Sequence, residues 1–325
     1  MVDAPPGHPV AGVDYPQAWK EFHAWFPDEQ ACLRYLVRLR WPSGFVCPRC
    51  GHEGGWLSNR GLVTCAGCRS QTSPTAGTIF HKTRTPLTTW FAAMWYVTNQ
   101  KNGVSALGLS RVLGMHYETA WTWLHKLRRA MVRPDRDRLA GTVEVDETYV
   151  GGPEQGHPGR QAVTKSIVAI AVERPSSKGL GRVRLCRIPN VAGATLVGFV
   201  RDVVAPDTTI RTDGWPGYAG LSEAGFAHKV TVLRTSADLA HVAMPGVHRV
   251  ASLLKRWLLG THQGSVSPRH LDYYLDEFTF RFNRRTSRGR GLLFYRLVQQ
   301  SVRTDPHPLK DLIGGIKAGQ PAEVE

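Results

Sequence analysis

The chain has 325 residues, which is enough for two or three domains of ordinary size. Hydrophobic residues make up 42% and charged residues 21%, which excludes a wholly disordered protein. The 41 Lys and Arg residues outnumber the 26 Asp and Glu residues, giving a net charge of +15. Because such a basic protein is expected to bind a polyanion, nucleic acid is the leading candidate partner. A basic protein with no nucleic-acid role is the alternative.

The N-terminus and the cysteine content predict the compartment. No stretch approaches the ~18 apolar residues of a membrane span. The Pro- and Gly-rich start lacks the basic and apolar regions of a secretory signal, so residues 1–17 are expected to form a flexible tail. Six cysteines are too few for a disulfide scaffold, and four of them form two C-x-x-C pairs. This usage favours metal binding in a reducing compartment, and the expected location is the cytoplasm, in association with the nucleoid.

The first predicted elements are helices on either side of the cysteine pairs. Apolar spacing predicts a helical stretch over 17–40 that restarts at Asp28, and a helix over 86–99 with proline in its first turn. The cysteine pairs between them match the tetrahedral thiolate set of Zn²⁺, and since all four ligands are cysteine, the metal is predicted to be structural. Buried or redox cysteines are the alternative. The expected unit is a helix plus zinc ribbon over 18–80, with ligands Cys47, Cys50, Cys65 and Cys68.

The next segment predicts two short helices around a glycine-containing turn. They cover Ser105–Leu113 and His116–Met131, with the turn at Gly114. This pattern resembles a helix-turn-helix, and we expect a DNA-binding region over 81–133. An ordinary helical hairpin with a solvated basic face is the alternative. Candidate DNA contacts on the second helix are Lys126, Arg128 and Arg129.

The second half changes from helical to mixed patterning. Alternation and apolar runs predict strands over 142–150, 166–172, 181–188 and 208–212, with a helix over 195–204 before the last of these. From Pro245 onward the pattern is mostly helical. This order predicts a mixed α/β fold rather than regular βαβ repeats.

Two aspartates stand out on these strands. Asp146 lies in the middle of the first strand, and Asp213 directly follows the last one. A charge in a strand is costly unless it is paired or binds a metal, and two aspartates on neighbouring strand ends can share Mg²⁺. A turn cap or salt bridge is the alternative for each. Further along, Lys255 lies two helical turns after His248 and therefore on the same helix face.

Six blocks of this sequence together resemble bacterial insertion-sequence transposases that join an N-terminal zinc ribbon to a DDE-type, ribonuclease-H-like domain. The blocks are RWPSGFVCPRCG (40–51), AGTIFHKTRTPLTTWF (76–91), VEVDETYVGG (143–152), RTDGWPGY (211–218), VHRVASLLKRWLLGTHQG (247–264) and YLDEFTFRFNRR (274–285). The resemblance covers most of residues 18–300. It implies an α/β fold class, with a zinc ribbon and a helical, helix-turn-helix-like part followed by a ribonuclease-H-like mixed-sheet catalytic domain over 140–300. Residues 301–325 are expected to form a C-terminal tail.

The resemblance also implies an activity. Such a protein binds the terminal inverted repeats of its element and catalyses metal-dependent DNA cleavage and strand transfer into target DNA, as a homo-oligomer assembled on the DNA ends. Two Mg²⁺ or Mn²⁺ ions about 3.5–4 Å apart are held by three ligands. Asp146 and Asp213 match the first two, and the third, usually Glu, falls on His248. Lys255 matches the basic residue that contacts DNA phosphate at the terminal nucleotide.

His248 departs from the family pattern, because imidazole binds Mn²⁺ acceptably but is a poor ligand for Mg²⁺. Three interpretations stay open: a working His variant, a site completed by Glu277, or an inactive copy that still binds DNA. Glu277 lies near the edge of the apolar stripe of its helix, and a solvent-facing side chain is the alternative for it. The nearby basic residues suit phosphate contacts, and the candidates there are Lys255, Arg256, Arg281, Arg284 and Arg285.

Two other functions compete with transposition. One is a catalytically inactive or domesticated zinc-ribbon protein that binds DNA as a regulator. The other is a ribonuclease-H-like nuclease that does not rejoin strands. A regulator has no need of paired aspartates on adjacent strands, so the aspartates favour an enzyme.

Overall fold

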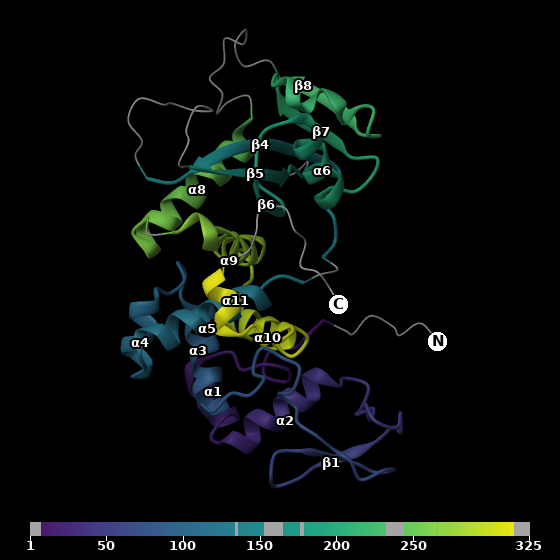
Figure 1. Cartoon of the computed structure of the whole chain (residues 1–325), viewed down its shortest axis with the longest axis vertical. Helices are drawn as coiled ribbons and strands as arrows, with labels where there is room; N and C mark the ends of the chain where they lie inside the picture. The colour runs from purple at the N-terminus through teal and green to yellow at the C-terminus, as the bar shows by residue number, and fades with distance from the viewer. Residues whose placement is uncertain are drawn as a thin grey trace. The chain divides into compact units, whose positions relative to one another are not determined.

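The computed structural model describes residues 8–133, 136–152, 165–175, 179–231, 244–264 and 266–314 (Figure 1). The chain divides into two compact units. The first consists of Met1–Arg133 and Thr286–Leu312, and the second of Pro134–Arg285 and Ile313–Glu325. Across the described ranges, every helix is too short or too polar to cross a membrane.

Most of the first unit is helical. Its helices are α1 (Trp19–Trp25), α2 (Glu29–Arg40), α3 (Leu87–Asn99), α4 (Ala106–Leu113), α5 (Tyr117–Ala130) and α10 (Arg290–Ser301), and α11 (Leu309–Gly314) follows. The predicted restart of the first helical stretch is confirmed, because the carboxylate of Asp28 accepts the backbone N–H of Ala31 at 2.8 Å and caps α2.

The ribbon is a small antiparallel sheet inserted between α2 and α3. Strands β1 (Gly55–Leu57), β2 (Val63–Cys65) and β3 (Gln71–Thr72) pair in that order. Its core is small, with Phe45, Val63 and two of the cysteines buried together. A core of this size provides little support on its own, so the ribbon is of the kind that a structural metal would stabilise.

The division between the units differs from the expected boundaries. The catalytic domain was expected to run to residue 300, yet 286–312 belongs to the first unit, because α10 buries Phe294 in an aromatic cluster there. Part of each expected tail is also ordered: Tyr15 and Leu312 are buried. The remaining tail residues, 1–7 and 315–325, lie outside the described residues. The partners of Phe294 are the rings of Phe22, Phe26, Tyr35, Phe91 and Trp95.

A five-stranded mixed sheet organises the second unit. Its elements are β4 (Thr142–Val150), β5 (Ser166–Glu173), β6 (Val183–Ile188), α6 (Gly193–Val203), β7 (Thr209–Asp213), the 3₁₀ helix η2 (Pro216–Leu221), β8 (Ala227–Thr231), α8 (Pro245–His262), the 3₁₀ helix η3 (Pro268–His270) and α9 (Leu271–Asn283). The strand order is β6-β5-β4-β7-β8. The first three strands are antiparallel, and β4, β7 and β8 are parallel. This is the mixed α/β architecture expected of the ribonuclease-H-like fold.

Helices cover both faces of this sheet. Helices α8 and α9 pack on one face, over Val168, Ile170 and Val172 of β5, and α6 and η2 pack on the other, over Val143 and Val145 of β4 (Figure 1). Because successive strand residues point to opposite faces, the even-numbered residues of β4 share the face that α8 covers.

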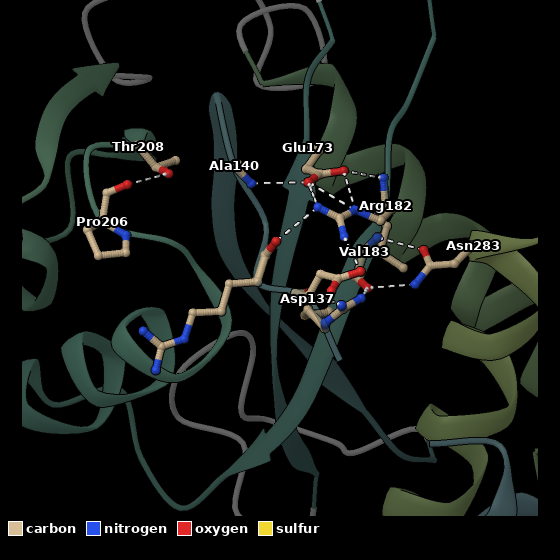
Figure 2. A network of polar contacts seen from close by, with 10 residues as sticks. Asp137, Ala140, Glu173, Arg182, Val183, Pro206, Thr208 and Asn283 are labelled. Carbon is tan, nitrogen blue, oxygen red and sulfur yellow. Dashed lines mark hydrogen bonds and ion pairs between the residues drawn. The ribbon is translucent and has the colours of Figure 1, made fainter. Parts of the chain in front are cut away.

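A polar network fastens the strand β6 (Figure 2). The guanidinium of Arg182 donates to the carboxylate of Glu173 at 2.6 Å, and that carboxylate also accepts the backbone N–H of Ala140. At the edge of the sheet, the side-chain amide of Asn283 exchanges two hydrogen bonds with the backbone of Val183, at 2.7 and 3.1 Å. The end of α9 therefore occupies backbone groups of the edge strand that could otherwise pair with another chain.

Candidate metal centres and nucleic-acid interface

The four ribbon cysteines form a ready zinc site. Their sulfur atoms all lie within 4.8 Å of one another. The Cys47–Cys68 and Cys50–Cys65 sulfur pairs are each 3.7 Å apart. A tetrahedron with Zn–S bonds of about 2.3 Å has edges of about 3.8 Å. The predicted ligand set therefore fits Zn²⁺ in both chemistry and size, and it leaves no position open for a substrate.

Ser70 supports this site and was not predicted from the sequence. Its hydroxyl lies 3.2 Å from the sulfur of Cys47 and 3.0 Å from that of Cys68. Hydrogen bonding by Ser70 lowers the pKa of Cys47 to about 6. Since zinc binds the thiolate, the hydroxyl favours the metal-binding form. The position of Ser70, two residues after the last cysteine, is the sequence signal that could have predicted this role.

The two predicted aspartates occupy equivalent places on neighbouring strands. Strands β4 and β7 pair in parallel up to Glu144 and Arg211, and Asp146 and Asp213 each lie two residues further along. Residues level with each other on parallel strands point to the same face of the sheet. Asp146 is directly opposite Ile170 of β5, whose side chain packs beneath α8 and α9. The aspartates therefore lie on the face that carries α8.

Helix α8 brings His248 to Asp146. The Nδ1 atom of His248 is 4.0 Å from Oδ2 of Asp146, and both side chains are partly exposed. Two ligands of one octahedral ion with bonds of 2.0–2.1 Å lie about 3 Å apart when adjacent and about 4.2 Å apart when opposite. The two side chains would therefore hold one divalent ion after little movement. Within the described part of the chain, only the cysteine cluster already has three or more ligand residues this close.

The loop after Asp213 is held in place from the other face of the sheet. The Asp213 carboxylate accepts the backbone N–H of Trp215 at 3.0 Å, and the indole of Trp215 donates to the carbonyl of Val191. Five residues after Asp213, the hydroxyl of the buried Tyr218 donates to the carboxylate of Glu147 on β4 at 3.0 Å. Burial raises the pKa of Tyr218, and the charge of Glu147 raises it further. The phenol therefore stays protonated and remains a donor.

Lys255 and Arg256 are exposed on α8, and the phosphate contacts predicted for them require this exposure. Burial of part of its side chain lowers the pKa of Lys255, and the nearby charge of Lys165 lowers it further. Lys165 is thus a basic neighbour that was not predicted from the sequence. The two positive charges disfavour each other, and a phosphate would offset that repulsion.

Glu277 has a partner of its own. It is almost completely buried, at 1% exposure, rather than facing solvent as the alternative prediction held. Its carboxylate accepts the Nε–H of Arg281 at 2.8 Å, and a second nitrogen of that guanidinium is equally close. The pair joins residues four apart on α9. Arg281 therefore serves this buried carboxylate, and with 11% of its side chain exposed it is not displayed for the phosphate contact predicted for it.

The two arginines that follow α9 also contact protein. The guanidinium of Arg284 lies over the ring of Phe280, 4.1 Å from its centroid. Arg285 donates to the backbone carbonyls of Leu180, Gly181 and Phe282. Arg285 remains exposed overall, so it could still contact phosphate, but its donors already serve the segment before β6.

The predicted helical hairpin is present as α4 and α5. Gly114 ends α4 in the left-handed conformation, with φ of 62°, which glycine adopts without strain. On α5, Lys126 and Arg129 are half-buried, and burial lowers the pKa of Lys126. Arg128 is only 2% exposed. Its predicted DNA contact is not compatible with this burial, because its position on α5 faces the interior.

A zinc ribbon followed by a mixed sheet with level aspartates on adjacent strands defines a class of protein, the zinc-ribbon transposases with a ribonuclease-H-like domain. The comparisons agree. Residues 138–283 match the family model of the ISXO2-like transposase domain, and residues 27–71 match that of the transposase zinc-ribbon domain. Both matched regions are therefore domains of the transposase type.

A curated relative comes from Haemophilus influenzae and is named an uncharacterized transposase-like protein. The two chains are 28% identical over 115 residues, which make up 35% of this chain and 92% of the relative.

Proposed function

We propose that the chain is a working transposase that cleaves the ends of its insertion sequence and transfers the strands into target DNA. The observation that carries this proposal is the position of His248 on α8, 4.0 Å from Asp146 and on the sheet face shared with Asp213. We further propose that the chain assembles as a homo-oligomer on the DNA ends, in association with the nucleoid. Catalytic divalent ions would be held by these three residues, and when bound they would supply an activated oxygen nucleophile and stabilise the leaving oxygen.

The chain's own residues define the remaining roles. Asp146 and Asp213 present carboxylate oxygens toward the bound DNA, and their shared strand register keeps them level. Lys255, with Lys165 as a basic neighbour, would hold a phosphate of the DNA. The imidazole of His248 makes the site better suited to Mn²⁺ than to Mg²⁺, since nitrogen is a poor ligand for the harder ion.

The first part of the test is cleavage of a labelled duplex containing one element end. Asp146→Asn and Asp213→Asn should each abolish cleavage. Asp202→Asn is the matched control, because this aspartate is exposed on α6, which packs on the opposite face of the sheet. Full activity in both site variants would refute the assignment. Tight binding of the ends without cleavage by the unaltered chain in either metal would favour a regulator instead.

The second part concerns the third ligand. His248→Ala should abolish cleavage in both metals, whereas His248→Glu should retain it and shift the preference from Mn²⁺ toward Mg²⁺. If His248→Ala cleaves as well as the unaltered chain, His248 is not a ligand.

We propose that DNA binding uses cations that reach the surface of each unit, half-buried on α5 and exposed on α8. The candidates on the described surface are Lys126 and Arg129 of α5 with Lys255 and Arg256 of α8. Each phosphate contact that is removed should lower the slope of log K against log salt by about 0.9. Lys255→Ala should therefore give a shallower slope, whereas Arg128→Ala should leave the slope unchanged because that side chain is buried.

A further inference from the structure

Glu144 is a buried carboxylate at the start of α8. It lies on β4, and none of its surface is exposed. Its Oε2 atom accepts the backbone N–H of Gly246 at 2.7 Å and that of Val247 at 3.1 Å. No side chain of α8 itself caps these groups, and Pro245 occupies the first position of the helix. Glu144 thus caps α8 from another element of the fold, where a helix N-terminus favours negative charge.

Two arginines balance the buried charge. The Oε1 atom of Glu144 is 3.2 Å from Nε of Arg174, and 3.9 Å from a terminal nitrogen of Arg211 on β7. A buried carboxylate is costly unless it is paired and hydrogen-bonded. The first N–H groups of α8 lie on one oxygen of the carboxylate and the two guanidinium groups lie on the other side, so the charge is compensated by groups from three other segments of the unit.

The contact allows only glycine at position 246. A Cβ atom placed there would lie 2.5 Å from Oε2 of Glu144 and 3.0 Å from Cδ of Arg174. The distance to the carboxylate is shorter than any van der Waals contact, so a side chain at this position must push the carboxylate away. Gly246 has an ordinary negative φ, so its backbone conformation does not by itself exclude alanine.

On both elements, the residue of the capping contact lies the same number of positions before the candidate metal ligand. Glu144 lies two residues before Asp146 on β4, and Gly246 lies two residues before His248 on α8. The backbone nitrogen of Gly246 is 2.7 Å from Oε2 of Glu144, and the side chains of Asp146 and His248 are 4.0 Å apart. A shift of the first turn of α8 relative to β4 would therefore change the distance between the candidate ligands directly.

We infer that Glu144 is a positioning residue: by capping α8 it sets His248 at the distance from Asp146 at which both bind one divalent ion. This inference rests on the proposed function, because it takes Asp146 and His248 to be ligands. Outer residues that orient metal ligands typically change metal affinity 10- to 100-fold when they are altered.

The test measures binding of Mn²⁺ alone to the full-length, zinc-loaded protein, by calorimetry and by the electron paramagnetic resonance signal of free Mn²⁺. Glu144→Gln and Gly246→Ala should each weaken Mn²⁺ binding at least tenfold. Two matched variants should bind as the unaltered chain does. Gly260→Ala places the same methyl group on the same helix with nothing within 4 Å, and Glu173→Gln alters a carboxylate paired with Arg182, away from α8.

Gly246→Ala separates positioning from a general loss of stability. Alanine ordinarily strengthens a helix relative to glycine. If circular dichroism shows Glu144→Gln to be unfolded, the alanine variant decides the question. Unchanged Mn²⁺ affinity in a folded Gly246→Ala or Glu144→Gln variant overturns the inference, and so does an equal loss of affinity in Glu173→Gln. Unchanged affinity in both Asp146→Asn and His248→Ala would instead overturn the proposed metal site itself.

Discussion

The hydrogen bond between Tyr218 and Glu147 makes a sharp prediction about how the loop after Asp213 is held. Tyr218→Phe removes the hydroxyl but keeps the buried ring, so no cavity is created. A hydrogen bond to a charged group is worth about 1.5–3 kcal/mol net. Glu147 is partly exposed, and water can replace the lost donor. The expected loss in free energy of unfolding therefore lies below that range, at about 1 kcal/mol.

The assay is urea unfolding of the full chain. The transition to follow is that of the second unit, which is the one that zinc chelation should not shift. Glu147→Ala and the double variant complete a double-mutant cycle, because alanine removes the acceptor that glutamine would keep. In the Glu147→Ala background, Tyr218→Phe loses no hydrogen bond to residue 147, so the coupling free energy should approach the cost of Tyr218→Phe in the unaltered chain. A coupling indistinguishable from zero would refute the hydrogen bond. A loss above about 3 kcal/mol for Tyr218→Phe would show that the hydroxyl does more than bind Glu147.

Four further outcomes are expected. Chelating zinc should unfold the ribbon and weaken DNA binding while the second unit keeps its amide protection in hydrogen exchange. Asp28→Ala should destabilise the first unit by about 1 kcal/mol, measured by urea unfolding. Phe294→Ala should cost that same unit about 3–5 kcal/mol and leave the unfolding of the second unit unchanged. Burial alone would raise the pKa of Glu173, but hydrogen bonds from Arg182 and backbone N–H groups lower it from 4.5. Its stabilisation is therefore present above that pH and lost as pH falls through the depressed value, and Glu173→Gln should reduce this acid sensitivity.

Local patterns were sufficient where burial alternates along the chain. The strand predicted over 142–150 has those bounds in the structure, because Val143 and Val145 are buried on one face. Strand β8 was not predicted. Its sequence, AHKVT, is mostly exposed at the sheet edge and shows no apolar face. Its pairing with β7 comes from backbone hydrogen bonds, which leave no mark on side-chain patterning.

Glu144 could have been found from the sequence. The argument that a charge in a strand needs a partner singled out Asp146, and it applies equally to the glutamate two residues earlier on the same face. The sequence could not name that partner, because the N–H groups of Gly246 and Val247 lie about a hundred residues away. A remote helix cap has no local signature, since the helix itself lacks a capping side chain.

Burial in the fold also decided two helical residues whose side chains were expected elsewhere. Arg128 falls four residues after Leu124, on the inner face of α5, yet an arginine in a basic protein is expected at the surface. Glu277 was expected near the edge of an apolar stripe, and its burial depends on Arg281 reaching back along α9. In both cases the side chain's chemistry suggested exposure, and its place in the fold determined burial.

The surroundings of the three acidic residues of β4 differ, and they indicate which residue would bind a divalent ion. Arginines already balance the charge of Glu144, so an ion would gain little there and would have to displace hydrogen bonds. Glu147 points to the other face, where it binds a phenol. Asp146 lies between them in sequence, with 19% of its side chain exposed beside an imidazole. We propose that this exposure beside a second candidate ligand makes Asp146, rather than Glu144 or Glu147, the residue of β4 that holds the ion.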